Sequence, residues 1–373
     1  MYYSNILLFL LVLVIALSCT TSSLETTAEL ISIDIENGPK TDNPEYEVDL
    51  VRIIPLETTD ESIFGVVNRI EVVDGRIYIL DIQQGKGIYV FHENGDFIGR
   101  TKNGKGPGEM LNPFAFYVDH VENRLVVWDQ SLSSLFEFDY NFVLKNKIRS
   151  ELFIDDINSV QGGKLVHFED EKKGANTFAL FSDELEKLIY FQDFSYDSKH
   201  GSQYLDRSIS VGSETLLITP NHYFIYGYDE KVIKPKYEID FKEKSLREED
   251  LKEGVEQIWE RILGKEKVSF PLSVFESHRF IGFNVMYGHE YSTFLINKST
   301  NELIQLADFI GSPKLPKCRI LGSMGQAKDL FYGLIEPRDL IKFHEENRDV
   351  ELMPKDSVPQ PNDNPLLILL DIK

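Results

Sequence analysis

The stretch NGKGPGEM, residues 103–110, combines three glycines and a proline between two hydrophobic runs, a composition that could cradle a phosphate. A phosphate-binding loop needs a strand before it, a helix behind it and a Lys-Ser or Lys-Thr pair at its end. Here no helical pattern follows, and Glu109 stands where the lysine is needed. The sequence therefore predicts a corner between two groups of strands, without nucleotide binding.

Metal and hydrolase motifs are incomplete in this chain. His289 and Glu290 begin like the zinc motif H-E-x-x-H, but Thr293 replaces the second histidine. The stretch GSMG, residues 322–325, lacks the spacing of the G-x-S-x-G nucleophile elbow. Single ligands from distant segments could still meet in the folded chain. The motifs themselves predict no metal, no cofactor and no catalytic residue.

Asp81 and Asp129 are candidate acids, because each ends a strand-like run at an equivalent position. Their repetition favours a structural role, in which each carboxylate caps the N–H groups of a turn. Cys318, within LPKCRIL, is interpreted as a small packed residue and not as a nucleophile.

These residues lie within short β-type runs that repeat along the chain. GRIYILD (75–81) aligns with NRLVVWD (123–129), and Phe91 aligns with Phe138, which gives a period in the forties. Several strands per unit at this period are typical of β-propeller blades. The fold class predicted is all-β, a six-bladed propeller. Its blades are expected at residues 66–110, 111–150, 153–193, 207–242, 270–308 and 317–373.

A propeller must close its ring or leave a sheet edge exposed. The stretch YEVDLVRIIPLET, residues 46–58, is a spare strand before the first blade. We expect it to pair in the last blade beside PLLILLDIK, residues 365–373, so that the two ends of the domain 46–373 join.

One helical insert, about 245–264, interrupts the strands. Ser245 and Glu248 have the spacing of a capping box, and Gly264 suits the C-terminal stop. An apolar stripe at helical spacing is expected to pack on the propeller rim, although it could instead dock a partner. The stripe consists of Leu251, Val255, Ile258, Trp259 and Ile262.

The N-terminus has the pattern of an export signal. The apolar run from Ile6 to Leu17 is too short to span a bilayer as a helix and is followed by small residues and Cys19. We interpret residues 1–18 as a lipoprotein signal peptide, Cys19 as the site of lipid attachment and the polar stretch 19–45 as a flexible tether. The alternative is an ordinary secretory signal with an incidental cysteine.

Several of these segments together resemble a known family. GKGPGE followed by FYVDHVENRLVVWD resembles the NHL-type repeat. More closely, IIPLETTDESIFG, KPKYEIDF and NPLLILLDIK resemble the 6-bladed β-propeller lipoproteins of Gram-negative bacterial envelopes. The resemblance covers residues 48–373. It implies a secreted, lipid-anchored propeller, and it carries no established ligand or catalytic residue.

Charge narrows the choice of partner. With 61 acidic against 39 basic residues, the net charge of −22 argues against nucleic acid and against an anionic membrane surface. We expect a monomeric binding module, without enzymatic activity, for an unknown protein, glycan or peptide. Its predicted location is the envelope, more on the periplasmic face of the outer membrane than on the surface.

The alternative function is a propeller hydrolase or lyase that acts on glycans or peptides. Three or more His, Asp or Glu side chains from different blades at the channel mouth would favour the enzyme. A mouth lined by aromatic and amide side chains would favour the binding module.

Overall fold

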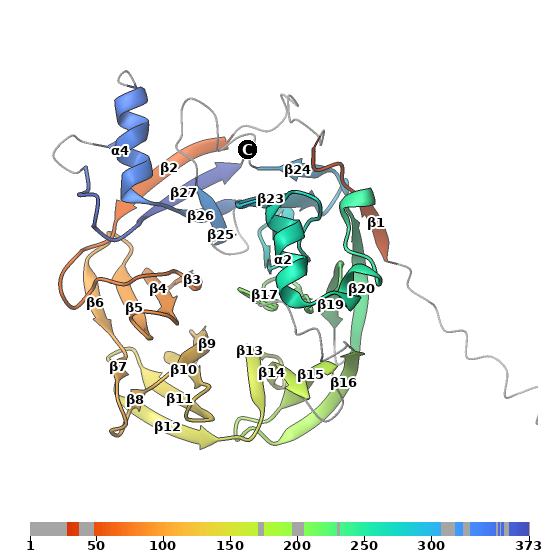
Figure 1. The fold of residues 1–373 in the computed structure, drawn as a ribbon. Coiled ribbons are helices and arrows are strands. Elements are labelled where there is room, and N and C mark those ends of the chain that lie inside the picture. Colours follow the sequence, from red (N-terminus) through yellow and green to blue (C-terminus); the bar gives the residue numbers. More distant parts are fainter. Residues whose placement is uncertain are drawn as a thin grey trace, which may run out of the picture.

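The structure is a computed structural model, and it shows six sheets arranged around a central axis (Figure 1). The innermost strands are β3, β9, β13, β17, β21 and β25, and each sheet continues outward from there. The predicted six-bladed propeller is therefore confirmed. The described residues are 28–36, 48–170, 175–195, 205–229, 232–306, 318–323, 329–347, 350, 352–353 and 358–372.

From the axis outward, the strands of the first three blades follow the order of the chain. Blade one contains β3 (Arg69–Val73), β4 (Arg76–Asp81), β5 (Gly87–His92) and β6 (Phe97–Arg100). Blade two contains β9 (Pro113–Asp119), β10 (Arg124–Asp129), β11 (Ser134–Asp139) and β12 (Leu144–Arg149). Blade three contains β13 (Phe153–Val160), β14 (Gly163–Asp170), β15 (Ala175–Phe181) and β16 (Lys187–Ser195).

Two of the other three blades, four and six, also include a strand from the start of the chain. Blade four contains β17 (Ile209–Val211), β18 (Thr215–Leu217), β19 (Phe224–Asp229), β20 (Val232–Asp240) and, outermost, β1 (Glu29–Ser32). Blade five contains β21 (Ser273–Glu276), β22 (Phe280–Tyr287), β23 (Glu290–Asn297) and β24 (Leu303–Gln305). Blade six contains β25 (Arg319–Ser323), β26 (Leu330–Ile335), β27 (Leu366–Ile372) and, outermost, β2 (Val48–Pro55).

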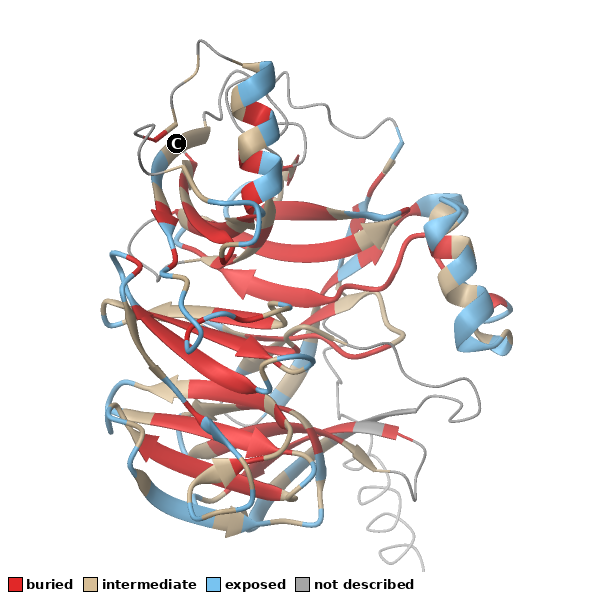
Figure 2. Cartoon of the chain, turned by 60° about the vertical axis from the view of Figure 1, so that its left-hand side comes forward, coloured by how far each residue is buried: buried red, intermediate tan, exposed pale blue. Residues whose placement is uncertain are grey.

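Interior strands such as β4 are mostly apolar because both of their faces are covered. In β4, Ile77 and Ile79 pack into the core between blades six and one, whereas Tyr78 and Leu80 pack into the core between blades one and two. Successive side chains of a strand point to opposite faces, so one strand serves two interfaces. Figure 2 shows the resulting burial of the blade interiors.

The ring closes as the sequence predicts. β2 pairs antiparallel with β27, in a register that runs from Val48 opposite Ile372 to Pro55 opposite Leu366. β26 pairs with the other edge of β27, which is therefore an interior strand of blade six. Leu366 and Leu367 are fully buried and pack against blades five and one, respectively.

The expected tether 19–45 is wrong for the part that the structure describes. Within 28–36, β1 pairs parallel with β20, with Glu29 opposite Tyr237, as the outermost strand of blade four (Figure 1). Ile31 and Ile33 are buried in the core between blades four and five. The alternating apolar residues of this segment therefore have a partner edge, which makes them part of the propeller.

The helical insert begins later than predicted. Instead of starting at a capping box of Ser245 and Glu248, α2 spans Val255–Leu263, and Gly254 is its N-cap. Two 3-10 turns occupy part of the preceding segment. Ser245 is unavailable as a helix cap because its Oγ accepts the N–H of Phe241 at 2.8 Å, in the turn after β20.

Most of the predicted apolar stripe packs on the rim, but Val255 is exposed. Ile262 is fully buried with Phe270, and Ile258 and Trp259 pack against the same cluster. Tyr223, next to blade four, completes it. Gly264 forms the C-cap, as predicted.

A second helix, α4 (Pro337–Glu346), was not predicted. It lies in the connection between β26 and β27, begins with Pro337 at its first turn and buries Leu340 and Phe343. Figure 2 shows both helices at the periphery, each with an exposed side. No α-helix within the described ranges is long and apolar enough to cross a membrane.

The glycine-rich stretch is the predicted corner between blades one and two. β7 (Lys102–Asn103) pairs parallel with β8 (Glu109–Met110). The Gly106 N–H donates to Glu109 Oε2 at 2.8 Å. The loop's own carboxylate thus occupies an amide that a phosphate-binding loop would offer to its ligand.

Asp81 and Asp129 have the predicted structural role. Asp81 Oδ1 accepts the N–H groups of Gln83 and Gln84, both at 2.9 Å. Asp129 Oδ2 accepts those of Leu111 and Asn112, at 2.6 and 2.8 Å. Each carboxylate therefore fixes a turn or the connection that enters its blade.

Deletion of residues 366–373 should unfold the domain, although the segment is terminal. Each buried Leu or Ile contributes about 1.5–3 kcal/mol, and the total stability of a domain is only about 5–15 kcal/mol. Circular dichroism melts of the parent and the deletion variant provide the measurement. A melting temperature within about 3 °C of the parent would show that β27 does not close the ring.

Ile33→Ala should cost about 2–5 kcal/mol of unfolding free energy, because it removes a fully buried side chain. The matched control is Leu30→Ala, whose side chain is 59% exposed and whose effect should stay within about 0.5 kcal/mol. Urea unfolding measures both. Equal effects of the two substitutions would show that this segment is a tether and does not pack on the propeller.

Candidate functional site

Charged side chains from three blades meet at the axis. Arg69, at the start of β3, donates to Asp156 of β13 at 2.6 Å and to Glu71 at 2.8 Å. Arg207, just before β17, donates to the same oxygen of Glu71 at 3.1 Å. We call Arg69, Glu71, Asp156 and Arg207 the axial cluster. It joins blades one, three and four by contacts between residues far apart in the chain.

The axial cluster balances its own charge, with two arginines and two carboxylates. The Arg69 and Asp156 side chains are only 4% and 3% exposed, so neither could remain charged alone without a large desolvation cost. Burial opposes the charge on Arg69, but Asp156 and Glu71 outweigh it and hold the pKa of Arg69 above its usual value. Breaking one pair would leave a buried charge without compensation.

A cavity of about 330 Å³ lies beside the axial cluster, and we call it the axial pocket. Its walls come from blades two and three and from the connection into blade four. They combine acidic and aromatic side chains with one histidine. The lining residues are Phe114, Gln130, Phe153, Asp155, Asp156, His167, Glu169, Leu205, Asp206, Arg207, Ser208 and Pro220.

A β-bulge shapes the inner wall of the axial pocket. Ile154 pairs with Phe168 and Asp156 with His167, so Asp155 is an extra residue without a partner in the ladder. Ile154 and Ile157 both pack into the core between blades two and three. A bulge of this kind redirects side chains and is common beside functional sites. Here it lets two successive aspartates line one cavity.

Asp155 is a carboxylate of this wall that lacks a counter-charge. It is half-buried and has no hydrogen bond or ion pair within the described part of the chain. Burial raises the pKa of Asp155 to about 8, and the neighbouring carboxylates of Glu169 and Asp156 add to this effect. The acid is therefore mostly protonated at neutral pH.

His167 is fully buried as a neutral ring, and its pKa shifts in the opposite direction to that of Asp155. Its Nδ1 lies 2.9 Å from Ser208 Oγ, and its ring stacks on Phe178 with centroids 4.5 Å apart. Burial lowers the pKa of His167 to about 4, against the opposing pull of Asp156. Nε2 has no hydrogen-bond partner among the described residues.

The other carboxylates of the axial pocket include two that are paired with arginines. Asp156 is held by Arg69, and its Oδ2 also accepts the Ser208 N–H at 2.9 Å. Asp206 pairs with Arg319, whose guanidinium lies 3.8 Å over the ring of Tyr291. These pairs bind the connections between blades together, so their charges already have a structural role.

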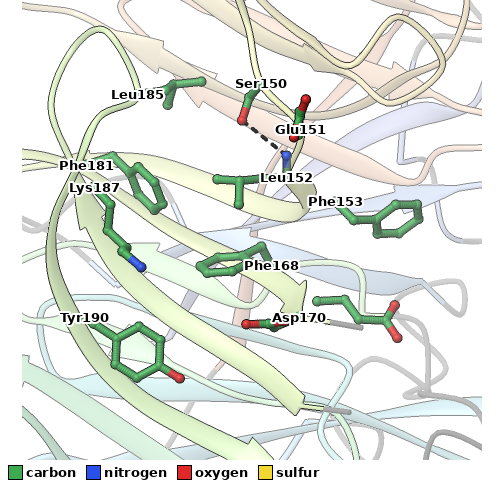
Figure 3. A pocket seen from close by; sticks show the side chains of 11 residues that line it. Ser150, Glu151, Leu152, Phe153, Phe168, Asp170, Phe181, Leu185, Lys187 and Tyr190 are labelled. Atoms are coloured by element: carbon green, nitrogen blue, oxygen red, sulfur yellow. Dashed lines mark hydrogen bonds between the residues drawn. The ribbon is translucent and has the colours of Figure 1, made fainter. Parts of the chain in front are cut away.

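A second cavity of about 620 Å³, the outer pocket, adjoins the axial pocket on blade three. Phe153 and Glu169 line both cavities. Figure 3 shows Lys187 and Tyr190 of β16 on one side of it and Phe153 on the other, with Phe168 between them. The lining residues are Ser150, Glu151, Leu152, Phe153, Phe168, Glu169, Asp170, Phe181, Leu185, Lys187 and Tyr190.

The remaining sequence candidates lie away from these cavities. Cys318 packs against the core between blades five and six, and burial raises the pKa of its thiol, as expected of a packed residue. His289 is exposed in the turn between β22 and β23, and Glu290 is exposed at the start of β23. Cys19 lies outside the described residues. Within the described ranges, no group of three or more His, Cys, Asp or Glu could hold a metal ion.

The residues of the axial pocket were not predicted from the sequence. The stretch FIDDIN, residues 153–158, was a usable signal, because two successive aspartates interrupt a run of β-type residues. The observed lining combines features expected of an enzyme and features expected of a binding module. The acidic group draws on two blades, because Asp206 comes from the connection into blade four, and two phenylalanines stand beside it. Its other members belong to blade three: Asp155, Asp156, His167 and Glu169.

Comparisons with known proteins agree with the fold. A solved protein of Bacteroides fragilis, described as a "Putative exported protein", has a TM-score of 0.73 at 18% identity, over 93% of this chain and 100% of that one. A member of the duf4221 family from Bacteroides vulgatus has a TM-score of 0.55 at 13% identity, over 88% and 99% of the two chains. No curated protein matches the sequence.

A family model described as "Domain of unknown function (DUF4934)" matches residues 29–371. The match begins at the first residue of β1 and ends within β27, so it includes all six blades. The chain therefore belongs to the DUF4934 family.

Proposed function

We propose that this propeller is a binding module without enzymatic activity, and that its ligand occupies the axial pocket and extends into the outer pocket. The observation that carries the proposal is Asp155. A bulge brings a carboxylate without a described partner to the wall of a ligand-sized cavity. Such a group destabilises the folded chain, and proteins retain costs of this kind mainly at functional sites.

A binding role is also supported by the neighbouring polar groups, which already have partners within the protein. Asp156 and Asp206 are held by arginines, and Ser208 Oγ contacts His167 Nδ1 at 2.9 Å. These groups form a rigid wall. The aromatic side chains of Phe114 and Phe153 add apolar surface, as in most small-ligand sites.

A second candidate, a hydrolase or lyase, is favoured by one specific observation. Asp155 has a pKa raised to about 8 and lies beside Glu169, which is the arrangement of a protonated acid next to a second carboxylate. Pairs of this kind perform general acid–base catalysis in glycosidases. Product formation would separate this candidate from the binding module.

Phe153 offers the sharpest test of the binding site, because it lines both cavities and is 42% exposed. The purified protein is incubated with an extract of envelope peptides and small molecules, and mass spectrometry identifies what it retains. We expect at least one solute that wild type retains and Phe153→Ala loses. The control is Val121→Ala, which changes a 76% exposed side chain outside both cavities.

Identical retention by all three proteins would place binding elsewhere and contradict the proposed site. New product masses formed by wild type but not by Asp155→Asn would instead favour the hydrolase or lyase.

We also propose that the module is anchored to the bacterial envelope by a lipid on Cys19, on the periplasmic face of the outer membrane. The support is the apolar run that ends before Cys19, together with the description of the Bacteroides fragilis relative as exported. The acidic composition is compatible with a site open to cationic ligands in that compartment.

Cys19→Ala should abolish labelling with palmitate and release the protein from the membrane fraction. Cys318→Ala is the matched control, because it removes the chain's other cysteine and should leave labelling unchanged. Metabolic labelling and sedimentation of both variants provide the measurement. Persistent labelling and sedimentation of Cys19→Ala would refute the lipid anchor.

A further inference from the structure

We propose that the axial pocket recognises a cationic group of its ligand, a primary ammonium or a guanidinium, through the carboxylates of Asp155 and Glu169. The inference rests on the proposed function and adds to it the chemical class of the ligand. It also predicts how binding responds to pH.

The geometry places these two carboxylates on neighbouring strands of one wall. Asp155 is the extra residue of the bulge in β13, and Glu169 belongs to β14 beside it. Both line the axial pocket, and Glu169 also lines the outer pocket. A cation in the axial pocket would therefore lie close to both carboxylates.

The charges that surround Asp155 leave it as the acid in need of a counter-charge. On its own strand, Asp156 is already paired with Arg69. On the connection into blade four, Asp206 is paired with Arg319, and Arg207 is paired with Glu71. A cationic ligand would supply what these neighbours do not supply to Asp155.

Histidine does not supply that counter-charge either. His167 faces the same cavity wall as a neutral ring, because burial lowers its pKa to about 4. Its fully buried Nε2 has no hydrogen-bond partner among the described residues, so a second polar group of the same pocket lining lacks a partner. A buried polar atom in this state is uncommon in folded proteins and points to a missing partner.

The apolar part of such a ligand has a place as well. Phe153 lies where the two cavities meet, and Phe168 and Tyr190 continue along the outer pocket (Figure 3). An alkyl or aromatic chain that carries the cation could therefore follow these side chains away from the axis. This shape suits a lysine-like or arginine-like side chain, or a free alkylamine.

Binding of a cation requires the ionised form of Asp155. With a pKa of about 8, about 1% of the carboxyl is ionised at pH 6 and about half at pH 8. An alkylamine stays protonated throughout, because its pKa lies near 10.4 as in lysine. Affinity should therefore rise about fifty-fold from pH 6 to pH 8, and binding should release a proton.

The probes are pentylamine and pentan-1-ol, which share their alkyl chain and differ mainly in charge. We measure the affinity of the wild-type protein for each by ligand-observed NMR at pH 6, 7 and 8. We expect pentylamine to bind at least tenfold more tightly than pentan-1-ol at pH 8, with the predicted loss of affinity towards pH 6. Equal affinities for the two probes, no detectable binding of either, or a flat pH profile would each overturn the inference.

Asp155→Asn keeps the shape of the side chain and removes its charge. It should lower the affinity for pentylamine at least tenfold at pH 8 and flatten the pH profile. The matched control is Asp60→Asn, which removes one exposed carboxylate outside both cavities and should leave both properties unchanged. If Asp155→Asn does not fold, the pH profile and probe comparison of the wild-type protein decide the question.

Failure of this inference can be told apart from failure of the proposed function. Loss of solute retention in Phe153→Ala, together with a flat pH profile and full affinity in Asp155→Asn, would keep the binding module and reject the cation. Unchanged retention in Phe153→Ala would reject the binding site itself.

Discussion

The antiparallel pairing of β2 with β27 is the constraint on which the arrangement at the axis depends. It unites the two ends of the domain in blade six and fixes blade one against blade six. In the closed ring, the starts of β3 and β13 and the connection into β17 meet at the axis, where the axial cluster forms. The contacts of Arg69 with Asp156 and of Arg207 with Glu71 therefore lie in a ring that is closed by a pairing at the rim.

The axial cluster in turn explains why Asp155 stands out. Ion pairs satisfy Asp156 and Asp206, and they hold the connections between blades in place. The bulge adds one more carboxylate to the same wall without adding an arginine for it. Its charge is disfavoured by burial and by its acidic neighbours, so the folded chain accommodates it mainly in the protonated form. A wall that is held by ion pairs and contains one carboxylate without a counter-charge suits a selective binding site.

The blades could be predicted from the sequence because their inner strands are buried on both faces and appear as continuous apolar runs such as RIYILD. The ring closure could be predicted because the β-type run 46–58 had no place in the first blade. β1 could not be predicted, because its partner β20 is distant in the chain and its flanking residues are polar. The start of α2 was missed because Ser245 caps a different turn. Asp155 was missed because a bulge depends on the register between strands, although the two aspartates in FIDDIN hinted at it.

Titration of Asp155 is the decisive measurement, because the proposed site depends on a carboxyl group that lacks a counter-charge until a cation binds. Labelling aspartate with carbon-13 at the carboxyl, with Asp155→Asn to assign the signal, allows its titration to be followed by NMR. We expect a pKa of about 8 for Asp155 in the free protein and a lower pKa when pentylamine saturates the pocket. A value near the ordinary 3.9 in the free protein, or one that pentylamine leaves unchanged, would contradict this expectation.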